Sequence, residues 1–391
     1  MKRPSPLAIV LAALVLFGAG LGIFVAVDSG GKPAPGPVVA NISPTLSLPA
    51  DSKLPGDFFG IVSEDAFANP GAYRTATLNR LARIGVGIVR QTFDWAAIER
   101  APDQYDFTTY DSFVGSLAIR RMTVLPVLLD PPPFRSSKPK TGAAAGTYPP
   151  ADYADMGRFA ATLVRRYGPR GRFWKLHPEL PKVPIRAWQV WNEPSLPAYW
   201  PTGPDPAQYT RLLEVVGHQI KRFDHRAEVV TAGIPDSRLG IPFSDFVKGM
   251  YRAGARGSFD SLAIHPYSRD ATGVAAAVED ARQIMDANGD RRSDIWVTEL
   301  GWADAGPASS FTVGASGQAE RISSVFRTLV RLRHQARLRG VVYFGWRDGA
   351  PYAPAFKDFW GLHTGLVDIK GNPKPALSAF AGAVATLRRQ G

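Results

Sequence analysis

The chain has 391 residues, of which 45% are hydrophobic and 20% charged, a balance typical of a globular protein with a large core. It contains no cysteine, which excludes a disulfide framework, a thiolate nucleophile and a cysteine metal site. The formal net charge is +12, but the basic residues are scattered and no nucleic-acid motif accompanies them, so no nucleic-acid partner is expected.

A basic start and a long apolar run open the chain. Lys2 and Arg3 precede an uncharged run from Leu7 to Val27. At about 1.5 Å per residue this run is long enough to cross a bilayer as a helix, whereas a signal-peptide core usually has about 7–15 residues. The sequence therefore favours a retained anchor over a cleaved signal peptide in residues 1–27. Either way, the rest of the chain is expected outside the cytoplasm, membrane-anchored or else secreted.

Proline, glycine and serine dominate residues 28–55, which predicts a flexible linker. Residues 56–391 follow as one domain, with a length that suits a (β/α)8 barrel.

Short apolar segments alternate with helical patterns through this domain. Eight segments are expected as buried strands: Phe58–Ser63, Val86–Gln91, Met122–Leu129, Ile185–Trp191, Glu228–Ala232, Ser261–His265, Ile295–Glu299 and Gly340–Gly345. The clearest helical patterns are Tyr73–Ile84, Asp152–Tyr167, Pro206–Phe223 and Gln318–Arg339. This alternation predicts the α/β class with a parallel sheet, and eight units favour a single closed TIM barrel over an open doubly wound sheet. No GxGxxG or P-loop motif follows a strand.

Three of the loops that follow strands are long, namely Asp130–Pro150, Pro194–Pro206 and Arg347–Gly365. The second and third carry aromatic residues: Tyr199, Trp200, Tyr352, Phe356, Phe359 and Trp360. Aromatic side chains at the catalytic end of a barrel are suited to contact the apolar faces of sugars. The alternative is that each one packs beneath its own loop.

Glu193 and Glu299 each stand at the end of an apolar run, the expected fourth and seventh strands. Carboxylates at the tips of parallel strands face the mouth of a barrel, and two ionisable groups beside apolar strands would be costly without a function. Cleaving a glycosidic bond needs one carboxyl group kept protonated and one kept ionised, about 5 Å apart in a retaining enzyme. The pair therefore indicates a retaining glycosidase.

The stretches Trp191–Pro194 (Trp-Asn-Glu-Pro) and Thr298–Trp302 (Thr-Glu-Leu-Gly-Trp) carry a resemblance to a known group. They resemble the clan A retaining glycoside hydrolases, a superfamily of (β/α)8 barrels with catalytic glutamates on strands four and seven. The chain is most similar to families 5 and 39, and the resemblance runs from Asp57 to the C-terminus. It implies that Glu193 is the acid/base and Glu299 the nucleophile.

The resemblance also implies roles for further residues, which would bind the substrate or support the glutamates. Asn192 would bind the sugar 2-hydroxyl, and Arg90, at the tip of the second strand, would keep the nucleophile ionised. His265 would line the pocket for the cleaved sugar, and Tyr267 would donate to the nucleophile. The alternatives without a catalytic function are a salt bridge at the end of the barrel for Arg90 and a structural role for His265.

Two tryptophans complete the expected substrate-binding set. The resemblance implies that Trp346, at the eighth strand, forms the floor beneath the cleaved sugar, although it could also be core filler. Trp200 is expected to contact sugar from the loop after the fourth strand. No metal-binding spacing occurs among the histidines, and the reaction needs no cofactor.

Three hypotheses follow for function. The first is a retaining glycoside hydrolase acting on a polysaccharide or glycoside. The second is a transglycosylase that remodels a cell-wall or surface polysaccharide, and the third is a catalytically inactive surface carbohydrate-binding protein. The basic net charge favours an acidic substrate such as a uronic-acid-bearing glycan. This indication comes from the charge of the whole chain, and no individual pocket residue supports it.

Overall fold

The computed structural model describes residues 53–351 and 357–390. The predicted anchor or signal segment in residues 1–27, most of the predicted linker in residues 28–55, and two loop aromatics, Tyr352 and Phe356, lie outside the described residues. Within the described part of the chain, no helix combines the length and apolar character needed to span a membrane.

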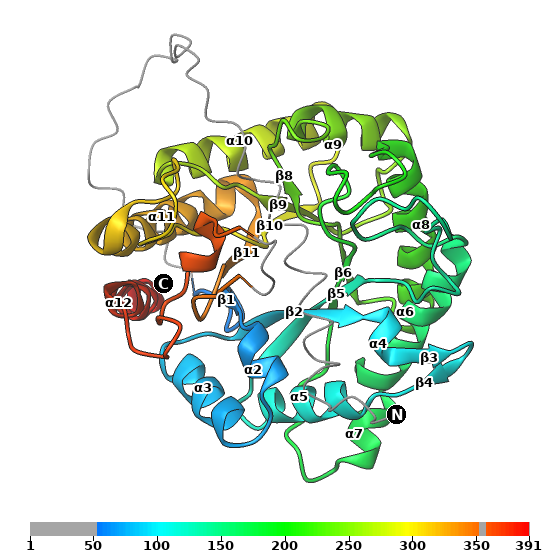
Figure 1. The fold of residues 1–391 in the computed structure, drawn as a ribbon, viewed down its shortest axis with the longest axis horizontal. Helices are drawn as coiled ribbons and strands as arrows, with labels where there is room; N and C mark the ends of the chain where they lie inside the picture. The colour runs from blue at the N-terminus through cyan, green and yellow to red at the C-terminus, as the bar shows by residue number, and fades with distance from the viewer. Residues whose placement is uncertain (1–52, 352–356, 391) are drawn as a thin grey trace.

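Eight parallel strands form a closed barrel, which confirms the predicted fold (Figure 1). In order around the barrel these are β1 (Phe59–Val62), β2 (Ile88–Asp94), β5 (Thr123–Leu129), β6 (Ala187–Val190), β7 (Glu228–Val230), β9 (Ser261–His265), β10 (Asp294–Val297) and β11 (Leu338–Tyr343). The barrel closes because β11 pairs with both β10 and β1. A two-residue strand, β8 (Ile234–Pro235), lengthens the sheet beside β9.

Helices surround the barrel in a ring (Figure 1). They are α2 (Glu64–Ala68), α3 (Ala72–Arg83), α5 (Thr108–Ala118), α6 (Tyr153–Tyr167), α7 (Arg172–Leu176), α8 (Pro206–Phe223), α9 (Phe243–Arg252), α10 (Ala271–Ala287), α11 (Gly314–Ala336) and α12 (Pro375–Gln390). After β2 the chain forms the short helix α4 (Trp95–Ile98) and the hairpin β3 (Glu99–Ala101) and β4 (Gln104–Tyr105). A 3-10 turn, η2 (Trp360–His363), lies in the loop after β11.

Side-chain caps mark where several helices begin. Asp152, Asp205 and Asp270 each accept a hydrogen bond from a backbone N–H in the first turn of the helix that follows. Such a cap satisfies a donor that has no partner within the helix. These aspartates are local signals, which is why the pattern located the starts of α6 and α8 closely.

One hydrophobic cluster inside the barrel takes one residue from each strand: Val62, Ile88, Leu125, Ala187, Val230, Ala263, Trp296 and Val342. Trp296 is the largest of them. Its indole fits because Gly340 faces it: a Cβ at that position would lie 2.4 Å from the Trp296 ring. A second, larger core lies between the strands and the helices. The barrel is thus a packed core with its working surface at one end.

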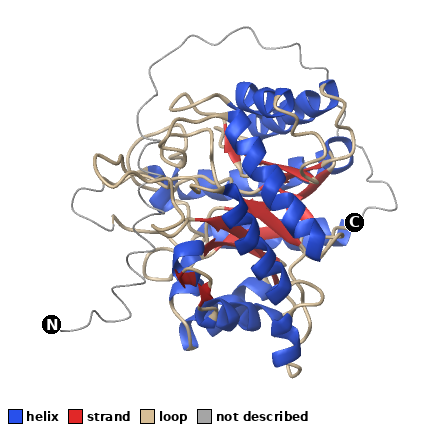
Figure 2. Cartoon of the chain, turned by 90° about the vertical axis from the view of Figure 1, so that its right-hand side faces the viewer, coloured by secondary structure: helices blue, strands red, loops and turns tan. Residues whose placement is uncertain are grey.

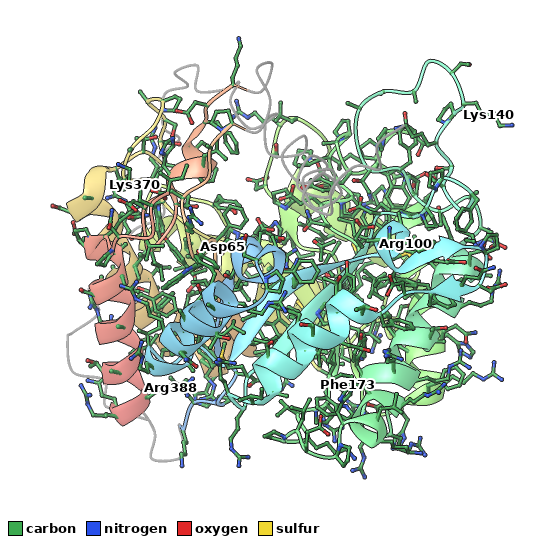
Figure 3. The ribbon with its side chains drawn as sticks, turned by 60° about the horizontal axis from the view of Figure 1, so that its bottom comes forward. Asp65, Arg100, Lys140, Phe173, Lys370 and Arg388 are labelled. Atoms are coloured by element: carbon green, nitrogen blue, oxygen red, sulfur yellow. The ribbon has the colours of Figure 1, made fainter. Side chains whose placement is uncertain are left out.

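The loops that leave the C-terminal ends of the strands gather at one end of the barrel (Figure 2). Figure 3 places Lys140, on the loop after β5, and Lys370, on the loop after β11, at this end, with Phe173 and Arg388 at the opposite end. We call the end with the long loops the mouth. The two predicted catalytic glutamates lie at this end, beyond the C-terminal ends of β6 and β10.

Candidate active site

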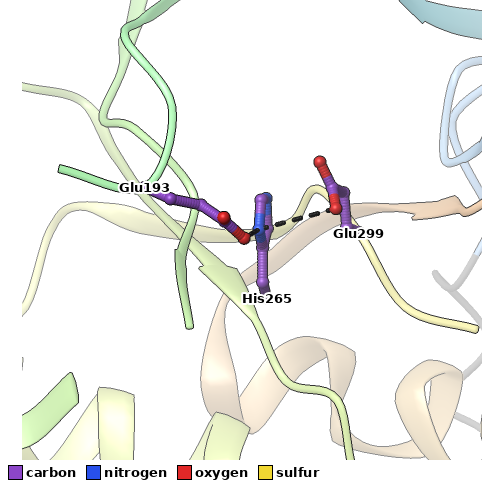
Figure 4. A group of neighbouring side chains, drawn as sticks. All are labelled: Glu193, His265 and Glu299. Carbon is purple, nitrogen blue, oxygen red and sulfur yellow. Dashed lines mark hydrogen bonds and ion pairs between the residues drawn. The ribbon is translucent and has the colours of Figure 1, made fainter. Parts of the chain in front are cut away.

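Glu193 and Glu299 meet in the mouth with the imidazole of His265 between them (Figure 4). Glu193 lies just beyond the end of β6 and Glu299 just beyond the end of β10, and each side chain is nearly buried. One oxygen of each carboxylate and one ring nitrogen of His265 all lie within 4.8 Å of one another. This spacing matches the roughly 5 Å of retaining glycosidases and is too short for the roughly 6.5–9.5 Å of inverting ones.

The backbone leaves β6 in an unusual conformation. Trp191 has a φ of 75° and Glu193 a φ of 41°, both in the left-handed region that non-glycine residues rarely adopt. Hydrogen bonds hold the turn: the Trp191 indole N–H donates to the Tyr199 carbonyl at 2.9 Å, and the Glu193 N–H donates to the Gly233 carbonyl at 3.1 Å. Strained conformations of this kind persist where surrounding contacts enforce them, and they cluster at functional sites.

Arg90 organises three polar groups around the nucleophile position. Its guanidinium donates to the carboxylate of Glu299 at 2.6 Å and to the side-chain amide oxygen of Asn192 at 2.7 Å. A third N–H donates to the side chain of Gln189 at 2.7 Å. The planar fork of arginine suits this arrangement, and its charge favours an ionised Glu299. The predicted contact of Arg90 with Glu299 is thus found in the structure, and the contact with Asn192 adds to it.

The position of Arg90 differs from the expectation, because β2 continues to Asp94 and Arg90 lies inside the strand rather than at its tip. Gln189 was not among the predicted site residues. It lies on β6, where its amide group also donates to the Thr231 carbonyl at 3.0 Å. A polar residue within an otherwise apolar strand is the signal in the sequence that could have identified it.

Tyr267 donates a hydrogen bond to Glu299 at 2.8 Å, as the resemblance implied. His265 occupies a different place from the expected lining of the sugar pocket. Its Nδ1 lies 2.8 Å from Glu193 and 3.7 Å from Glu299, and its ring is buried. Nε2 has no partner in the described structure and abuts Gly233, where a Cβ would lie 1.9 Å away. The proton therefore belongs on Nδ1, which donates to Glu193.

The two carboxyl groups have unequal electrostatic environments. Burial raises the pKa of Glu193 above its ordinary value, in spite of the contact with His265. Burial acts on Glu299 in the same sense, but the charges of His265 and Arg90 and the hydrogen bonds from Tyr267 and Arg90 outweigh it and lower the pKa of Glu299. Such a split is the arrangement that distinguishes an acid from an ionised carboxylate in a carboxyl pair: it favours the protonated form of Glu193 and the ionised form of Glu299.

Glu193, His265 and Glu299 present three atoms of the kind that bind metal ions. The guanidinium of Arg90, 2.6 Å from Glu299, already supplies a positive charge at that carboxylate. A divalent cation would be repelled by this neighbour, so the donor set suits proton transfer and nucleophilic attack better than metal binding.

The structure places the two predicted tryptophans away from the open mouth. Trp346 belongs to the core between strands and helices, and the guanidinium of Arg80 on α3 lies 5.4 Å from its ring centroid. Trp200 has no exposed surface and packs edge-to-face on Trp191 and Tyr209. Both therefore follow the alternatives weighed from the sequence, core filler for Trp346 and packing beneath its own loop for Trp200.

Phe344 takes the place expected for Trp346. It is half-buried and packs against the cluster of side chains inside the barrel. Alternation along β11 indicates this, because Val342 points inward and Phe344 is two residues further on. The loops after β10 and β11 add Phe311 and Trp360, whose rings lie 4.6 Å apart, with Trp360 also 5.2 Å from the Tyr267 ring.

Residues 191–358 match a family described as the glycosyl hydrolase catalytic core. The matched range includes both glutamates, His265 and Tyr267. No curated protein matches this chain.

Solved structures of glycoside hydrolases share the fold. A family 39 glycoside hydrolase from Bacteroides cellulosilyticus is 20% identical with a TM-score of 0.61, covering 86% of this chain and 65% of its own. A GH39 β-xylosidase from Caulobacter crescentus is 18% identical with a TM-score of 0.63, covering 86% and 72%. Xylanase 10B from Thermotoga maritima is 16% identical with a TM-score of 0.57, covering 86% and 97%. The chain thus spans about two thirds of the first of these. The predicted resemblance to (β/α)8 glycoside hydrolases is confirmed for the fold, which structures of family 39 share.

Proposed function

We propose that this protein is a retaining glycoside hydrolase that acts by double displacement, with Glu193 as acid/base and Glu299 as nucleophile. One observation carries the proposal: two buried carboxyl groups at retaining distance have pKa values displaced in opposite directions by their surroundings. A protein that only binds carbohydrate would not need this asymmetry.

The reaction follows from the protonation states. Glu193 gives its proton to the glycosidic oxygen while an oxygen of Glu299 attacks the anomeric carbon, so the bond to the leaving group breaks as the glycosyl–Glu299 bond forms. Glu193, now ionised, takes a proton from water, whose oxygen displaces Glu299 from the sugar. The hydrogen bond from His265 keeps Glu193 oriented through both steps.

Asn192 is placed to assist in the transition state. Arg90 binds its carbonyl oxygen, which directs the amide NH₂ away from Arg90. Two amide protons are therefore left to donate to a sugar hydroxyl, in agreement with the 2-hydroxyl contact that the resemblance implies. Phe344 offers an apolar surface for the face of the same sugar.

The test is substitution of each glutamate. Glu299→Ala and Glu193→Ala should each lower kcat by about 10³-fold or more, because each removes a reacting group. Azide should restore turnover of an activated aryl glycoside by Glu193→Ala, since it replaces water without needing a base. Glu179→Gln, an exposed residue far from the mouth, is the matched control. Full activity in both alanine variants, on a substrate that the wild type cleaves, would contradict the assignment of Glu193 as acid/base and Glu299 as nucleophile.

The substrate is to be found by screening. The similar solved structures include a β-xylosidase, xylanases and an exo-β-1,4-mannosidase, so aryl β-xylosides and β-mannosides head the panel. Mass spectrometry of the products separates hydrolysis from transglycosylation, because longer oligosaccharides form only in the second case. We also propose that the enzyme is anchored at the outer face of the cytoplasmic membrane, which rests on the apolar run in residues 7–27.

A further inference from the structure

A second group of acidic side chains lies in the mouth beside the glutamates. Asp94 is the last residue of β2, and Asp130 directly follows β5, the neighbouring strand. The register pairs Asp94 with Leu129. Asp94 also lies four residues beyond Arg90 on the same strand, so both side chains leave the same face of the sheet, toward the barrel axis. Two carboxyl groups therefore meet at the rim next to the catalytic centre.

These two carboxyl groups are only partly satisfied by the protein. One oxygen of Asp130 accepts a hydrogen bond from the Thr147 hydroxyl at 2.8 Å, and one oxygen of Asp94 caps α4 by accepting from the Ala97 N–H at 2.9 Å. The other oxygen of Asp130 has no hydrogen-bond partner among the described residues, and the residue keeps 9% of its surface exposed. No lysine, arginine or histidine in the described part of the chain forms an ion pair with Asp130.

Tyr199 adds an unpartnered hydroxyl to this group. The residue is only 1% exposed, yet its phenolic oxygen has no hydrogen-bond partner in the described structure. Its backbone is held in place by two hydrogen bonds, because the Trp191 indole donates to the Tyr199 carbonyl and the Thr147 N–H donates to the neighbouring Ala198 carbonyl at 2.8 Å. A rigid, buried tyrosine with a free hydroxyl is a ready hydrogen-bonding group for a ligand.

The electrostatics agree with this placement. Burial first, and then the nearby charges of Glu193, Glu299 and Asp130, raise the pKa of Tyr199 well above its ordinary value, which is consistent with a hydroxyl near both the catalytic pair and Asp130. Burial, and then the nearby charge of Asp94, raise the pKa of Asp130 to about 7. A buried carboxyl group without a cation is costly, and sites of this kind are common where a ligand supplies the missing partner.

We propose that Asp130, Asp94 and Tyr199 form a sugar subsite beside Glu193 that selects glycans by their hydrogen-bond donors, either hydroxyl or ammonium groups, and rejects uronic acids. The proposal rests on the proposed glycosidase function and names its substrate class. It reverses the hint from the net charge, because the groups that line this subsite are two carboxyl groups and a phenol although the whole chain is basic.

Binding can be measured without turnover by titration calorimetry on the full chain carrying Glu299→Gln. The probes are xylotriose, a glucosamine trisaccharide and a galacturonic acid trisaccharide. The neutral or the amino probe should bind, and the uronic acid probe should bind at least tenfold more weakly. With Asp130→Asn added, the probe that binds best should bind about tenfold more weakly. The ratio between its affinity and that of the uronic acid probe should become smaller. Tyr199→Phe should weaken binding by a similar factor.

The two sources of donors are told apart by comparing probes. If Asp130→Asn weakens the amino probe about tenfold and the neutral probe less than twofold, the ligand group is an ammonium. If it weakens both equally, the group is a hydroxyl. Amino-probe binding should also decline as pH falls from 7 to 5, because the probe stays an ammonium over this interval while Asp130, with a pKa of about 7, becomes protonated and loses its charge.

Asp103→Asn is the matched control, because Asp103 is an exposed aspartate on the neighbouring hairpin and asparagine tolerates its left-handed φ of 61°. The proposal is overturned if Asp130→Asn changes binding no more than this control does. It is equally overturned if the uronic acid probe binds best, or if neither the neutral nor the amino probe binds. Failure of the glycosidase function is read separately, from the absence of turnover and of covalent labelling of Glu299 by a fluorosugar in the wild type.

Discussion

Two identical side chains acquire different chemistry from their neighbours. Glu193 faces a histidine N–H in a buried setting, and Glu299 faces an arginine and a tyrosine. The pKa of the first is raised and that of the second lowered, so a pH interval exists in which Glu193 is protonated and Glu299 ionised. A bell-shaped dependence of kcat/KM on pH is expected, with Glu299 setting the acidic limb and Glu193 the basic limb.

Arg90 should control the acidic limb. Arg90 lowers the pKa of Glu299, so removing its charge in Arg90→Met raises that pKa and moves the acidic limb to higher pH. The kcat/KM at the optimum should fall by about 10²–10³-fold, as for loss of a preorganised donor. Measurement of the full pH–rate profile checks this. Arg90→Lys keeps the charge and should move the limb less; an unmoved acidic limb in Arg90→Met would show that another group sets it.

Phe344 and Trp346 should respond differently to substitution. Phe344→Ala removes the apolar surface offered to the sugar and should raise KM about tenfold, with little change in unfolding temperature. Trp346→Phe alters packing between strand and helix, so it should lower the unfolding temperature and leave KM nearly unchanged. Steady-state kinetics and thermal unfolding on both variants decide the matter. A raised KM in Trp346→Phe with an unchanged KM in Phe344→Ala would mean that Trp346, and not Phe344, contacts the sugar.

At the scale of elements, the ends of helices and strands depend on the backbone conformation of single residues, which hydrophobic periodicity does not indicate. The helical pattern predicted a helix through Arg339, but α11 ends at Ala336 and β11 begins at Leu338. Arg337 stands between them with a φ of 55°, in the left-handed conformation that ends many helices. Because Arg337 is not a glycine, the usual sequence signal for the end of a helix was absent.

This position allows a stability test. Arg337→Gly relieves the cost of a side chain in the left-handed region but loses the ion pair with Asp294 at 2.8 Å, whereas Arg337→Ala loses the pair and keeps the cost. The glycine variant should therefore be more stable than the alanine variant by about 1 kcal/mol. Denaturant unfolding of the two variants measures the difference. Equal stabilities would mean that the backbone strain is negligible here.

At the scale of the whole molecule, we expect the N-terminal apolar segment to attach the barrel to the membrane. If residues 7–27 form a retained anchor, the native protein should stay with the membrane fraction after alkaline carbonate washing and be released only by detergent. A protease added outside intact cells should then cut the catalytic domain, since the domain is expected on the outer side. Recovery of the protein in the medium, beginning near residue 28, would instead establish a cleaved signal peptide.

The sequence by itself determined the barrel and the identity of the two glutamates. Strand and helix periods are local patterns, and a carboxylate directly after a buried parallel strand has only the mouth to face, so Glu193 and Glu299 could be placed without coordinates. Tyr267 and Arg90 followed from the resemblance that those motifs carry.

Only the tertiary structure decided how the side chains around that pair are directed. It set His265 between the two glutamates, brought Gln189 to Arg90, and exchanged Trp346 for Phe344 at the barrel axis. It also buried Trp200 under its loop and brought together Asp94 at the end of β2, Asp130 directly after β5 and Tyr199 on the loop after β6. The physical reason is that side-chain direction and burial depend on contacts between residues far apart in the chain, which no local period records.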